Sequence, residues 1–490
     1  MWTAGPSCAA STGTCSRRGT EARTRPTGRI ALRDAATGKR LGAVKAPAGG
    51  DCALGPGGRV LASASFTDKE VGVWNVVNGR CLHRFRGAEG WSAGRPALQL
   101  GNLGGQFSFA GGGGALGGGG ALGGGGALGG GGLVGGPPQA GGLCSLTFSA
   151  DGRSLAAGWG HAVRVWRLDA GQSLRLFEEA PSEGAGLRAG VVAFSPDGRT
   201  LATAGPDGVV RLWEVSTGRL RRQTLIVAGP FPALRFSPDG RMLAAAAGGP
   251  RHGVHVFDLA AGQDRESQRG HQAPVTCLAF SPDGTRLASG SEDAGVLLWD
   301  VGKLLGRAPP APAAPTAAGL DALWRDLSRA DAEQAYAAVW RLAAAPAQSV
   351  PLLRERLRPA AAVDGTRVER LVADLDADAF AVREAATREL EALGPRAEAA
   401  LRRAAARPAS REAERRAERL LARLEGGRLP AEQLRALRAL EVLEAAGTPE
   451  AREVLRALAK GAADAALTQE AAAALERLGR RGGTWPGPGR

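Results

Sequence analysis

The chain has 490 residues, 44% of them hydrophobic, which is enough for two or three domains with buried cores. Its formal net charge is +14, but residues 1–50 hold nine Lys and Arg against two Asp and Glu, so half of the excess lies in one short stretch. This distribution is not typical of a domain-wide basic face for nucleic acid. The six cysteines and five histidines show no metal-ligand spacing, and no apolar run suits a signal peptide or a membrane span, so we expect no metal, no cofactor and a cytoplasmic location.

The N-terminal stretch shows no regular alternation of polar and apolar residues, and we expect residues 1–27 to be a disordered basic tail. The segment "RDAATGKRL" (33–41) then aligns with "WEVSTGRL" (213–220) further along the chain. It therefore predicts two strands of an incomplete sheet, with Arg33 at the position that Trp213 holds in the later copy.

One phrase recurs along the chain. It reads "LTFSADGRSLAAG" from Leu146, "VAFSPDGRTLATAG" from Val192, "LRFSPDGRMLAAAAG" from Leu234 and "LAFSPDGTRLASGS" from Leu278, with a weaker copy, "CALGPGGRVLASAS", from Cys52. The phenylalanines of the four strong copies are 46, 42 and 44 residues apart. A fixed period of this length is the mark of a repeat architecture.

Each copy predicts four short antiparallel strands. An apolar strand precedes the Ser-Pro-Asp-Gly turn, which supplies the fixed and the positive φ values of a tight turn. In the copy from Val192, "RTLATAG" and "VVRLWEV" alternate as the second and third strands, and "RLRRQ" is expected to be a polar fourth strand on the outside. Such a sheet is apolar on both faces, so copies must stack against one another.

The repeat resembles the WD40 family, whose sheets form the blades of a β-propeller. The WD-like dipeptides are Trp213-Glu214 and Trp299-Asp300, and Trp74-Asn75 and Trp166-Arg167 depart from the pattern. The resemblance implies a hydrogen-bonded set, here called the staple, within each sheet. Its members would be His271, Ser289, Asp293 and Trp299 in the last copy, Asp207 with Trp213, Asp68 with Trp74, and Trp166 alone.

The blade count is less regular. Residues 88–142 form a glycine-rich insert that cannot pack as a sheet. Counting five fairly complete blades, the incomplete N-terminal one and one position replaced or interrupted by this insert gives seven. We therefore expect a propeller over residues 28–306, strained or open on its N-terminal side.

Beyond residue 306 the pattern changes from strands to helices. Residues 307–320 predict a Pro/Ala linker, residues 321–480 a helical domain and residues 481–490 a disordered tail. Helix pairs are expected at 331–357, 368–394 and 432–461, with Gly394 and Gly447 ending helices and Thr448-Pro449 starting one. This part resembles HEAT-type repeats, through Asp378, Val382-Arg383 and Leu393-Gly394, against the alternative of a simple helical bundle.

Several patterns that could carry chemistry are better explained structurally. "GWSAG" (90–94) matches a nucleophile motif around Ser92, but no strand precedes it and no helix follows. His252 and His255 have no neighbouring Cys or carboxylate to complete a metal site. The acidic run 374–378 lacks calcium-loop spacing, and 409–425 alternates in sign like a solvated helix face.

We therefore expect no catalytic, cofactor or metal residues and a non-enzymatic scaffold that binds other proteins. The combination of a WD40 ring and a helical tail resembles multidomain WD-repeat proteins of GC-rich bacteria. Two alternatives stay open: a nucleic-acid-associated protein that uses the basic segment 17–45, which the charge distribution disfavours, or a regulatory part of an enzyme system. The partner, the binding face, the completeness of the N-terminus and the oligomeric state are left open.

Overall fold

The computed structural model describes residues 27–33, 40–47, 52–65, 70–86, 143–159, 162–168, 172–178, 190–205, 207–225, 231–246, 253–305, 314–361, 365–406, 409–425, 429–463 and 465–482. The expected basic tail 1–27 lies outside this range except for its last residue, and the insert 88–142 and the tail 483–490 lie wholly outside it. Ser92, Asp68 and His252 also lie outside the described residues.

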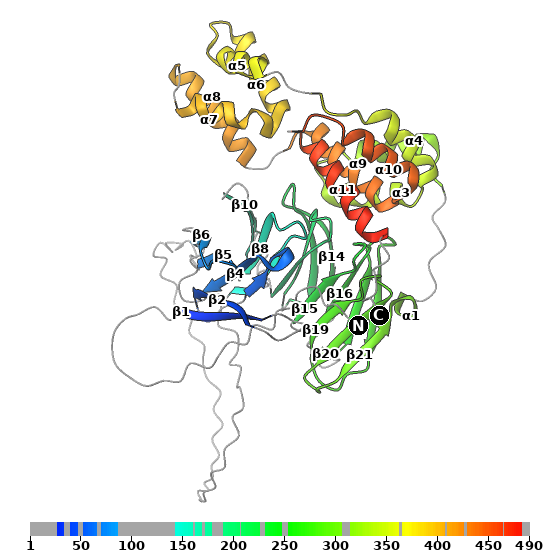
Figure 1. Ribbon diagram of the computed structural model, residues 1–490. Helices are drawn as coiled ribbons and strands as arrows, with labels where there is room; N and C mark the ends of the chain where they lie inside the picture. The colour runs from blue at the N-terminus through cyan, green and yellow to red at the C-terminus, as the bar shows by residue number, and fades with distance from the viewer. Residues whose placement is uncertain are drawn as a thin grey trace, which may run out of the picture.

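The described strands form six antiparallel sheets, which follow one another in chain order (Figure 1). The first has two strands, the next four have four each and the last has three. Their bounds are β1 Thr27–Arg33, β2 Arg40–Pro47; β3 Cys52–Leu54, β4 Val60–Ser65, β5 Glu70–Asn75, β6 Cys81–Arg86; β7 Leu143–Phe148, β8 Ser154–Trp159, β9 Ala162–Arg167, β10 Gln172–Glu178; β11 Val191–Phe194, β12 Thr200–Ala204, β13 Val209–Glu214, β14 Arg219–Leu225; β15 Ala233–Phe236, β16 Met242–Ala246, β17 Gly253–Asp258, β18 Gln263–Arg269; and β19 Val275–Phe280, β20 Arg286–Ser291, β21 Val296–Asp300.

The helices follow the last sheet. Their bounds are α1 Val301–Leu305, α2 Ala317–Asp326, α3 Ala332–Ala343, α4 Pro346–Arg356, α5 Gly365–Ala373, α6 Phe380–Leu393, α7 Glu398–Ala406, α8 Arg411–Glu425, α9 Ala431–Ala446, α10 Pro449–Leu458 and α11 Ala466–Gly482, with short 3₁₀ turns at Asp374–Asp376 and Gly394–Ala397. The helix pairs expected at 331–357, 368–394 and 432–461 are confirmed. Since α2 begins at Ala317, the last four residues of the expected linker are helical.

The recurring Ser-x-Asp-Gly segment forms the turn between the first and second strands, as the sequence predicted. The glycine has a positive φ in each strong copy, between 71° and 74°. In the turn at Ser195 the hydroxyl donates to Asp197 and accepts the backbone N–H of Thr200 at 2.9 Å. The turns at Ser149, Ser237 and Ser281 repeat this pattern. Each turn is therefore closed by its own side chains before any sheet packs on it.

The two faces of each complete sheet differ. One face, here the Leu–Trp face, pairs a leucine of the second strand with an aromatic residue of the third: Leu61–Trp74, Leu155–Trp166, Leu201–Trp213, Leu243–Phe257 and Leu287–Trp299. The opposite face, here the alanine face, carries small residues of the second strand and the residues one and three before that aromatic. The alternation follows from the period of two along a strand.

Each alanine face packs on the Leu–Trp face of the next sheet. Ala202 and Leu212, for example, lie against Leu243 and Phe257 in one buried cluster. The same arrangement joins the second sheet to the third, the third to the fourth and the fifth to the sixth. The two-stranded sheet packs in the same sense, with Ile30 and Val44 on the Leu–Trp face of the second sheet.

The expected seventh blade position at the insert is wrong. The sheets before and after residues 88–142 are direct neighbours, because Val71 and Val73 lie against Leu155 and Trp166 in one buried cluster. A further sheet between them has no room. The described sheets therefore form a continuous stack of six, and closure into a ring is not shown.

The helices divide into two groups with separate cores (Figure 1). Helices α2–α4 and α9–α11 share one core around Leu342, Leu353 and Leu443, while α5–α8 have their own around Leu390 and Leu401. The α5–α8 group is thus an insertion between α4 and α9. The predicted boundary after α9 is confirmed: Gly447 ends the helix at a φ of 63°, and the Thr448 hydroxyl caps α10.

Candidate functional site: the junction between the sheets and the helices

The helical layer rests on the fourth and fifth sheets through α3. Tyr336 is 5% exposed and lies in the cluster that joins these two sheets, with Trp340 packed beside it. The two aromatic rings meet edge to face, with centroids 6.0 Å apart. This apolar contact holds the helices against the crevice between two neighbouring sheets.

Beside the aromatic pair lies a buried group of four charges, here called the inner cluster: Glu214 of β13, Arg221 of β14, and Arg438 and Glu441 of α9. Arg438 donates from Nε to Glu214 Oε1 and from its terminal nitrogen to Oε2, both at 2.8 Å. Arg221 donates to Oε1 of the same carboxylate at 3.1 Å and to the two oxygens of Glu441 at 2.8 and 2.9 Å. These side chains are between 1% and 8% exposed.

The arginines of the inner cluster make further contacts. Arg438 donates to the carbonyl oxygens of Leu327 and Arg329, each at 2.8 Å, and Arg221 donates to the Thr200 hydroxyl at 2.7 Å. The guanidinium of Arg221 also lies 4.9 Å from the ring centroid of Tyr336, a cation–π distance. Two positive and two negative groups therefore neutralise each other in a place that excludes water.

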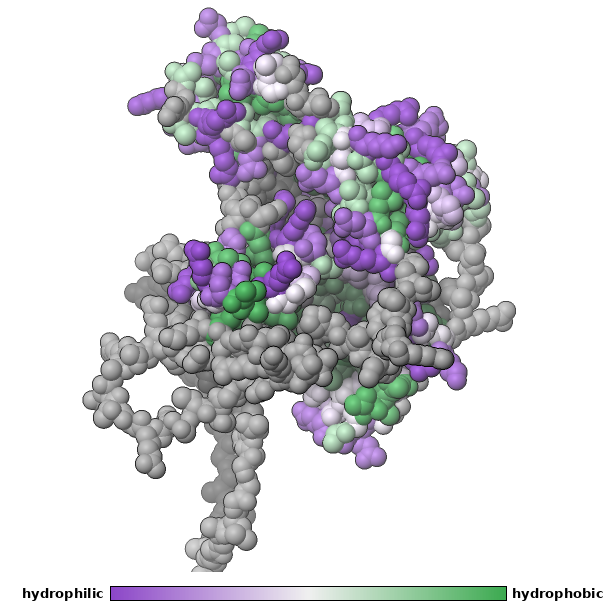
Figure 2. All heavy atoms as spheres, viewed as in Figure 1, coloured by the Kyte–Doolittle hydropathy of each residue, from purple (hydrophilic) through white to green (hydrophobic). Residues whose placement is uncertain are grey.

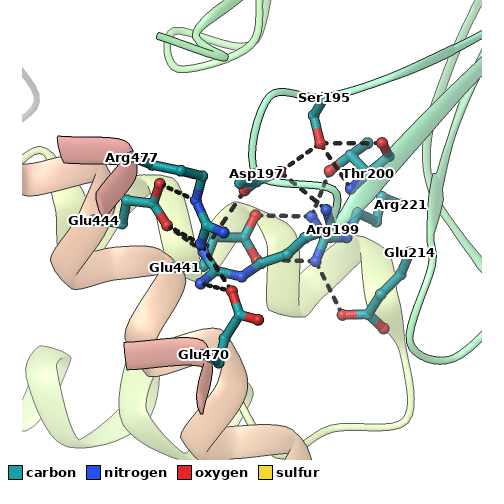
Figure 3. A network of polar contacts seen from close by, with 10 residues as sticks. All are labelled: Ser195, Asp197, Arg199, Thr200, Glu214, Arg221, Glu441, Glu444, Glu470 and Arg477. Carbon is teal, nitrogen blue, oxygen red and sulfur yellow. Dashed lines mark hydrogen bonds and ion pairs between the residues drawn. The ribbon is translucent and has the colours of Figure 1, made fainter. Parts of the chain in front are cut away.

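A second group, the outer cluster, joins the Ser195–Thr200 turn to two helices: Arg199, Glu444 of α9, and Glu470 and Arg477 of α11 (Figure 3). Arg199 lies 3.0 Å from Glu444 and 2.7 Å from Glu470. Arg477 binds both oxygens of Glu444 at 2.7 and 2.8 Å and reaches Glu470 at 2.8 Å. Each carboxylate is thus shared between a sheet arginine and a helix arginine.

The local sequence explains how α9 can contact the sheets on one face and the helical core on the other. Arg438, Glu441 and Glu444 are three residues apart and lie along one face of the helix, whereas Leu440 and Leu443 point into the helical core. A cavity of only about 30 Å³ lies beside Tyr336, Glu441 and Glu444. The two layers are therefore closely packed at this point.

The electrostatics of the inner cluster are uneven. Burial opposes ionisation of Glu214, but Arg221 and Arg438 outweigh it and lower the pKa of Glu214 to about 2. Burial raises the pKa of Glu441, because the attraction of Arg221 does not outweigh the loss of water. Glu214 is thus the carboxylate whose charge the junction stabilises most.

The expected staple residues of the last sheet lie together. His271 Nδ1 is 3.0 Å from Asp293 Oδ2, and His271 Nε2 is 2.8 Å from Ser289 Oγ, which accepts the indole N–H of Trp299 at 2.8 Å. The Asp293 carboxylate also accepts the backbone N–H groups of Gln272 and Gly295, at 2.9 and 2.8 Å. With Gln272 as the main cause, these bonds lower the pKa of Asp293 to about 2.

A Ser-His-Asp arrangement invites comparison with a nucleophilic triad. Here Ser289 is 0% exposed, and its hydroxyl already accepts the Trp299 indole while it contacts His271. A substrate carbonyl has no access to this oxygen, and no lone pair is directed at open space. The arrangement therefore fits a structural role.

The other expected staple residues are less complete. Trp74 donates to Ser63 and Trp213 to Thr203, each at 2.9 Å. Asp207 instead binds Arg211 at 2.6 Å and accepts the backbone N–H of Val209 at 3.1 Å. Trp166 stacks on Phe85, with centroids 5.1 Å apart.

Where the third strand has Phe257 instead of a tryptophan, the hydroxyl position two residues after the paired leucine is Ala245. A phenylalanine has no N–H to satisfy, so this sheet needs no acceptor at Ala245.

The remaining histidine candidate for a metal site can also be placed. His255 lies on the third strand β17, as expected. Within the part of the chain that the structure describes, no group of three His, Cys, Asp or Glu side chains is placed to hold a metal ion. In that same part, no helix is both long and apolar enough to cross a membrane.

The expectation that 409–425 presents a solvated charged face holds only in part. An i,i+4 pair forms between Glu412 and Arg416, at 2.7 Å. Arg416 is nevertheless buried, because it also reaches Glu384 of α6 at 2.8 Å. Charge alternation alone did not reveal this link between α6 and α8.

The junction itself was missed by the sequence analysis. The fourth strand "RLRRQ" was expected to be polar and outermost, but Arg221 within it is 3% exposed beneath the helices. The sequence feature that could have indicated this junction is the acidic residue after Trp213. A carboxylate at the end of one strand and an arginine early in the next can form an ion pair, and a helix packed on the sheet can add charged partners to it. Glu214 and Arg221 are partners across β13 and β14 in this way.

With this geometry in hand, comparison with known proteins identifies the repeats. Residues 190–214 and 262–300 match the family described as WD domain, G-beta repeat. The chain therefore contains WD40 repeats. A WD repeat-containing protein of Synechocystis is 33% identical over 103 residues, covering 21% of this chain and 28% of that protein.

Two further relatives match shorter parts of themselves. The human apoptotic protease-activating factor 1 is 37% identical over 101 residues, covering 20% of this chain and 8% of that protein. The ribosome biogenesis protein erb1 of Aspergillus clavatus is 48% identical over 60 residues, covering 12% of this chain and 8% of that protein. The chain thus matches between 8% and 28% of the length of these relatives, and the likeness concerns the WD40 repeats.

Replacing the buried hydroxyl of the last WD40 sheet should destabilise it. Ser289→Ala removes the acceptor of the Trp299 indole and the partner of His271, and we expect a loss of about 1–3 kcal/mol in the free energy of unfolding. Thr276→Ala, an exposed position on the neighbouring strand β19, should change it by less than about 0.5 kcal/mol. Urea unfolding measures both, and equal effects would contradict a special role for Ser289.

Breaking the inner cluster should cost more. Arg438→Ala leaves Glu214 buried with half of its hydrogen bonds gone, and we expect a loss of about 3–5 kcal/mol in the free energy of unfolding. The matched control is Arg354→Ala, which removes an exposed pair with Glu453 and should cost less than about 1 kcal/mol. The same unfolding experiment compares the two variants. Similar losses of unfolding free energy would show that removing a partner of this buried cluster costs no more than removing a partner of an exposed pair.

The inner cluster should also respond to acid. The folded-state pKa of Glu214 is about 2 against an ordinary 4.5, so the stabilisation is complete above pH 4.5 and is lost as the pH falls toward 2. The fall in pKa corresponds to about 3 kcal/mol. We expect the difference in unfolding free energy between wild type and Glu214→Gln to shrink from pH 5 to pH 2 at constant ionic strength. A difference independent of pH would refute the assignment.

Proposed function

We propose that this WD40-repeat protein is a non-enzymatic scaffold that binds other proteins through two surfaces held in a fixed relation. One surface belongs to the sheets, which we propose follow the arrangement of a propeller over residues 28–306. The other belongs to the helical domain 321–480, for which we keep the HEAT-type resemblance as a proposal. A cytoplasmic location remains part of this proposal.

The junction is the observation that supports it. The inner and outer clusters join β13, β14 and the Ser195–Thr200 turn to α9 and α11 through buried and half-buried charges. Buried ion pairs add little net stability, but they strongly penalise any arrangement that leaves a charge unpaired. A scaffold benefits from such a joint, because partners bound on the two surfaces are then held at one distance and angle.

The chemistry of the described residues agrees with this role. The Ser-His-Asp group of the last sheet is closed off by burial, and the charged residues of the junction neutralise one another. Two of the relatives are named as an apoptotic protease-activating factor and a ribosome biogenesis protein, and neither role forms part of this proposal.

The test is capture of partners by the full chain from the cells that produce it, with bound proteins identified by quantitative mass spectrometry. We expect defined proteins that resist nuclease treatment and stay bound between 50 and 200 mM salt. The Arg438→Ala chain should lose partners that contact both surfaces, and the Arg354→Ala chain should keep them. Capture of nucleic acid alone, with binding that falls steeply with salt, would overturn the proposal in favour of nucleic-acid association.

A further inference from the structure

Among the described residues, no other sheet covers the alanine face of the last sheet, β19–β21. Its third strand carries Val296 and Leu298, which are 70% and 54% exposed. Beside them lie Cys277, Ala279, Ala288 and Gly290, of which Cys277 is exposed and the others are half-buried. Figure 2 shows hydrophobic side chains gathered at the lower end of the molecule, where Figure 1 labels β20 and β21.

The same two positions are buried in the four preceding complete sheets. The residues three and one before the aromatic are Val71 and Val73, Val163 and Val165, Val210 and Leu212, and Val254 and Val256, each between 0% and 3% exposed. In those sheets the cover is the Leu–Trp face of the next sheet. The open face is therefore the next position of an interface that the chain has already repeated.

The chain has no described surface left to fill this position. The Leu–Trp faces of the second to sixth sheets are each packed against the sheet before them. The two-stranded sheet β1–β2 is not an equivalent cover: it has Arg33 at the aromatic position, and its sheet contains no strand with the paired leucine. A second copy has the same faces occupied, so it offers no matching cover either.

The shape of the open face agrees with such a partner. A Cβ added at Gly290 would lie 2.7 Å from the sulfur of Cys277, so this position has no room for a side chain. Strands β19 and β20 therefore form a shallow floor of small side chains. Leu298 and Val296 rise beside this floor on the edge strand β21. In the buried interfaces a large aromatic and a leucine lie over small residues of this kind.

We propose that the alanine face of β19–β21 is a docking surface for a β-sheet of another polypeptide, one that presents a leucine on its second strand and an aromatic residue opposite it on its third. The inference rests on the proposed scaffold function and specifies one partner surface for it. The partner sheet would form the next layer of the stack, with the same packing that joins the sheets of this chain.

The test uses a copy of residues 190–225 in place of the partner sheet. The copy is joined to the N-terminus of the full chain by a flexible linker long enough to reach any part of the surface. The copy presents the Leu201–Trp213 pair, and it should fold by packing on the open face. We expect labelling of Cys277 by a maleimide, followed by mass spectrometry of its peptide, to slow at least tenfold relative to the unextended chain.

Matched variants define the surface. Leu201→Glu in the added copy, or Leu298→Glu in the last sheet, should restore rapid labelling of Cys277. Leu225→Glu in the chain itself, which replaces a leucine that is 74% exposed on β14, should leave the protection intact.

Three results would overturn the proposal. Rapid labelling in the extended chain would show that the face does not accept a Leu–Trp sheet. Slow labelling of the unextended chain at every concentration would show that its own residues cover the face, and labelling that slows as the unextended chain is concentrated would identify a second copy as the occupant. None of these results affects the scaffold function itself, which depends on partners captured by the whole chain and fails only if no protein is captured.

Discussion

Each complete sheet that the structure describes has two apolar faces, and covering these faces is the main source of its stability. The chain meets this constraint with a directional solution: the alanine face of one sheet receives the leucine and aromatic residue of the next. This pairing explains why a leucine of the second strand lies opposite an aromatic residue of the third in each copy, and why the residues one and three before the aromatic are Val or Leu. A directional stack also has two different ends. One ends in the small sheet β1–β2, and the other ends in the exposed residues Val296 and Leu298.

The helices are attached by a different kind of interaction. Tyr336 and Trp340 supply apolar contact between two sheets, and the charged clusters decide how α9 is positioned over them. Apolar side chains tolerate small displacements, whereas Arg438 and Glu214 meet through two hydrogen bonds that a shift of one residue would break. We regard specificity of docking as the main contribution of these charges, since burying an ion pair yields little net stability.

The sequence predicted the strands and most helices because their signals are local. The Ser-x-Asp-Gly turns, the period of the repeat and the Gly447–Thr448 boundary each depend on a few neighbouring residues. It failed where distant segments meet. The position assigned to the glycine-rich insert was wrong because Val71 and Trp166 pack together across it. The burial of Arg221 was missed because a lone basic strand gives no sign of the helix that will lie on it.

The insertion of α5–α8 between α4 and α9 has a consequence for how such a chain can evolve. Both ends of the insertion return to helices of one common core, and it touches α9 through the Gln433 amide, which donates to the carbonyl oxygen of Ala392 at 2.5 Å. The charges that hold the helices to the sheets begin one turn further along α9, at Arg438. The α5–α8 segment can therefore be exchanged, lengthened or lost in evolution while the charged clusters keep α9 in the same position on the sheets.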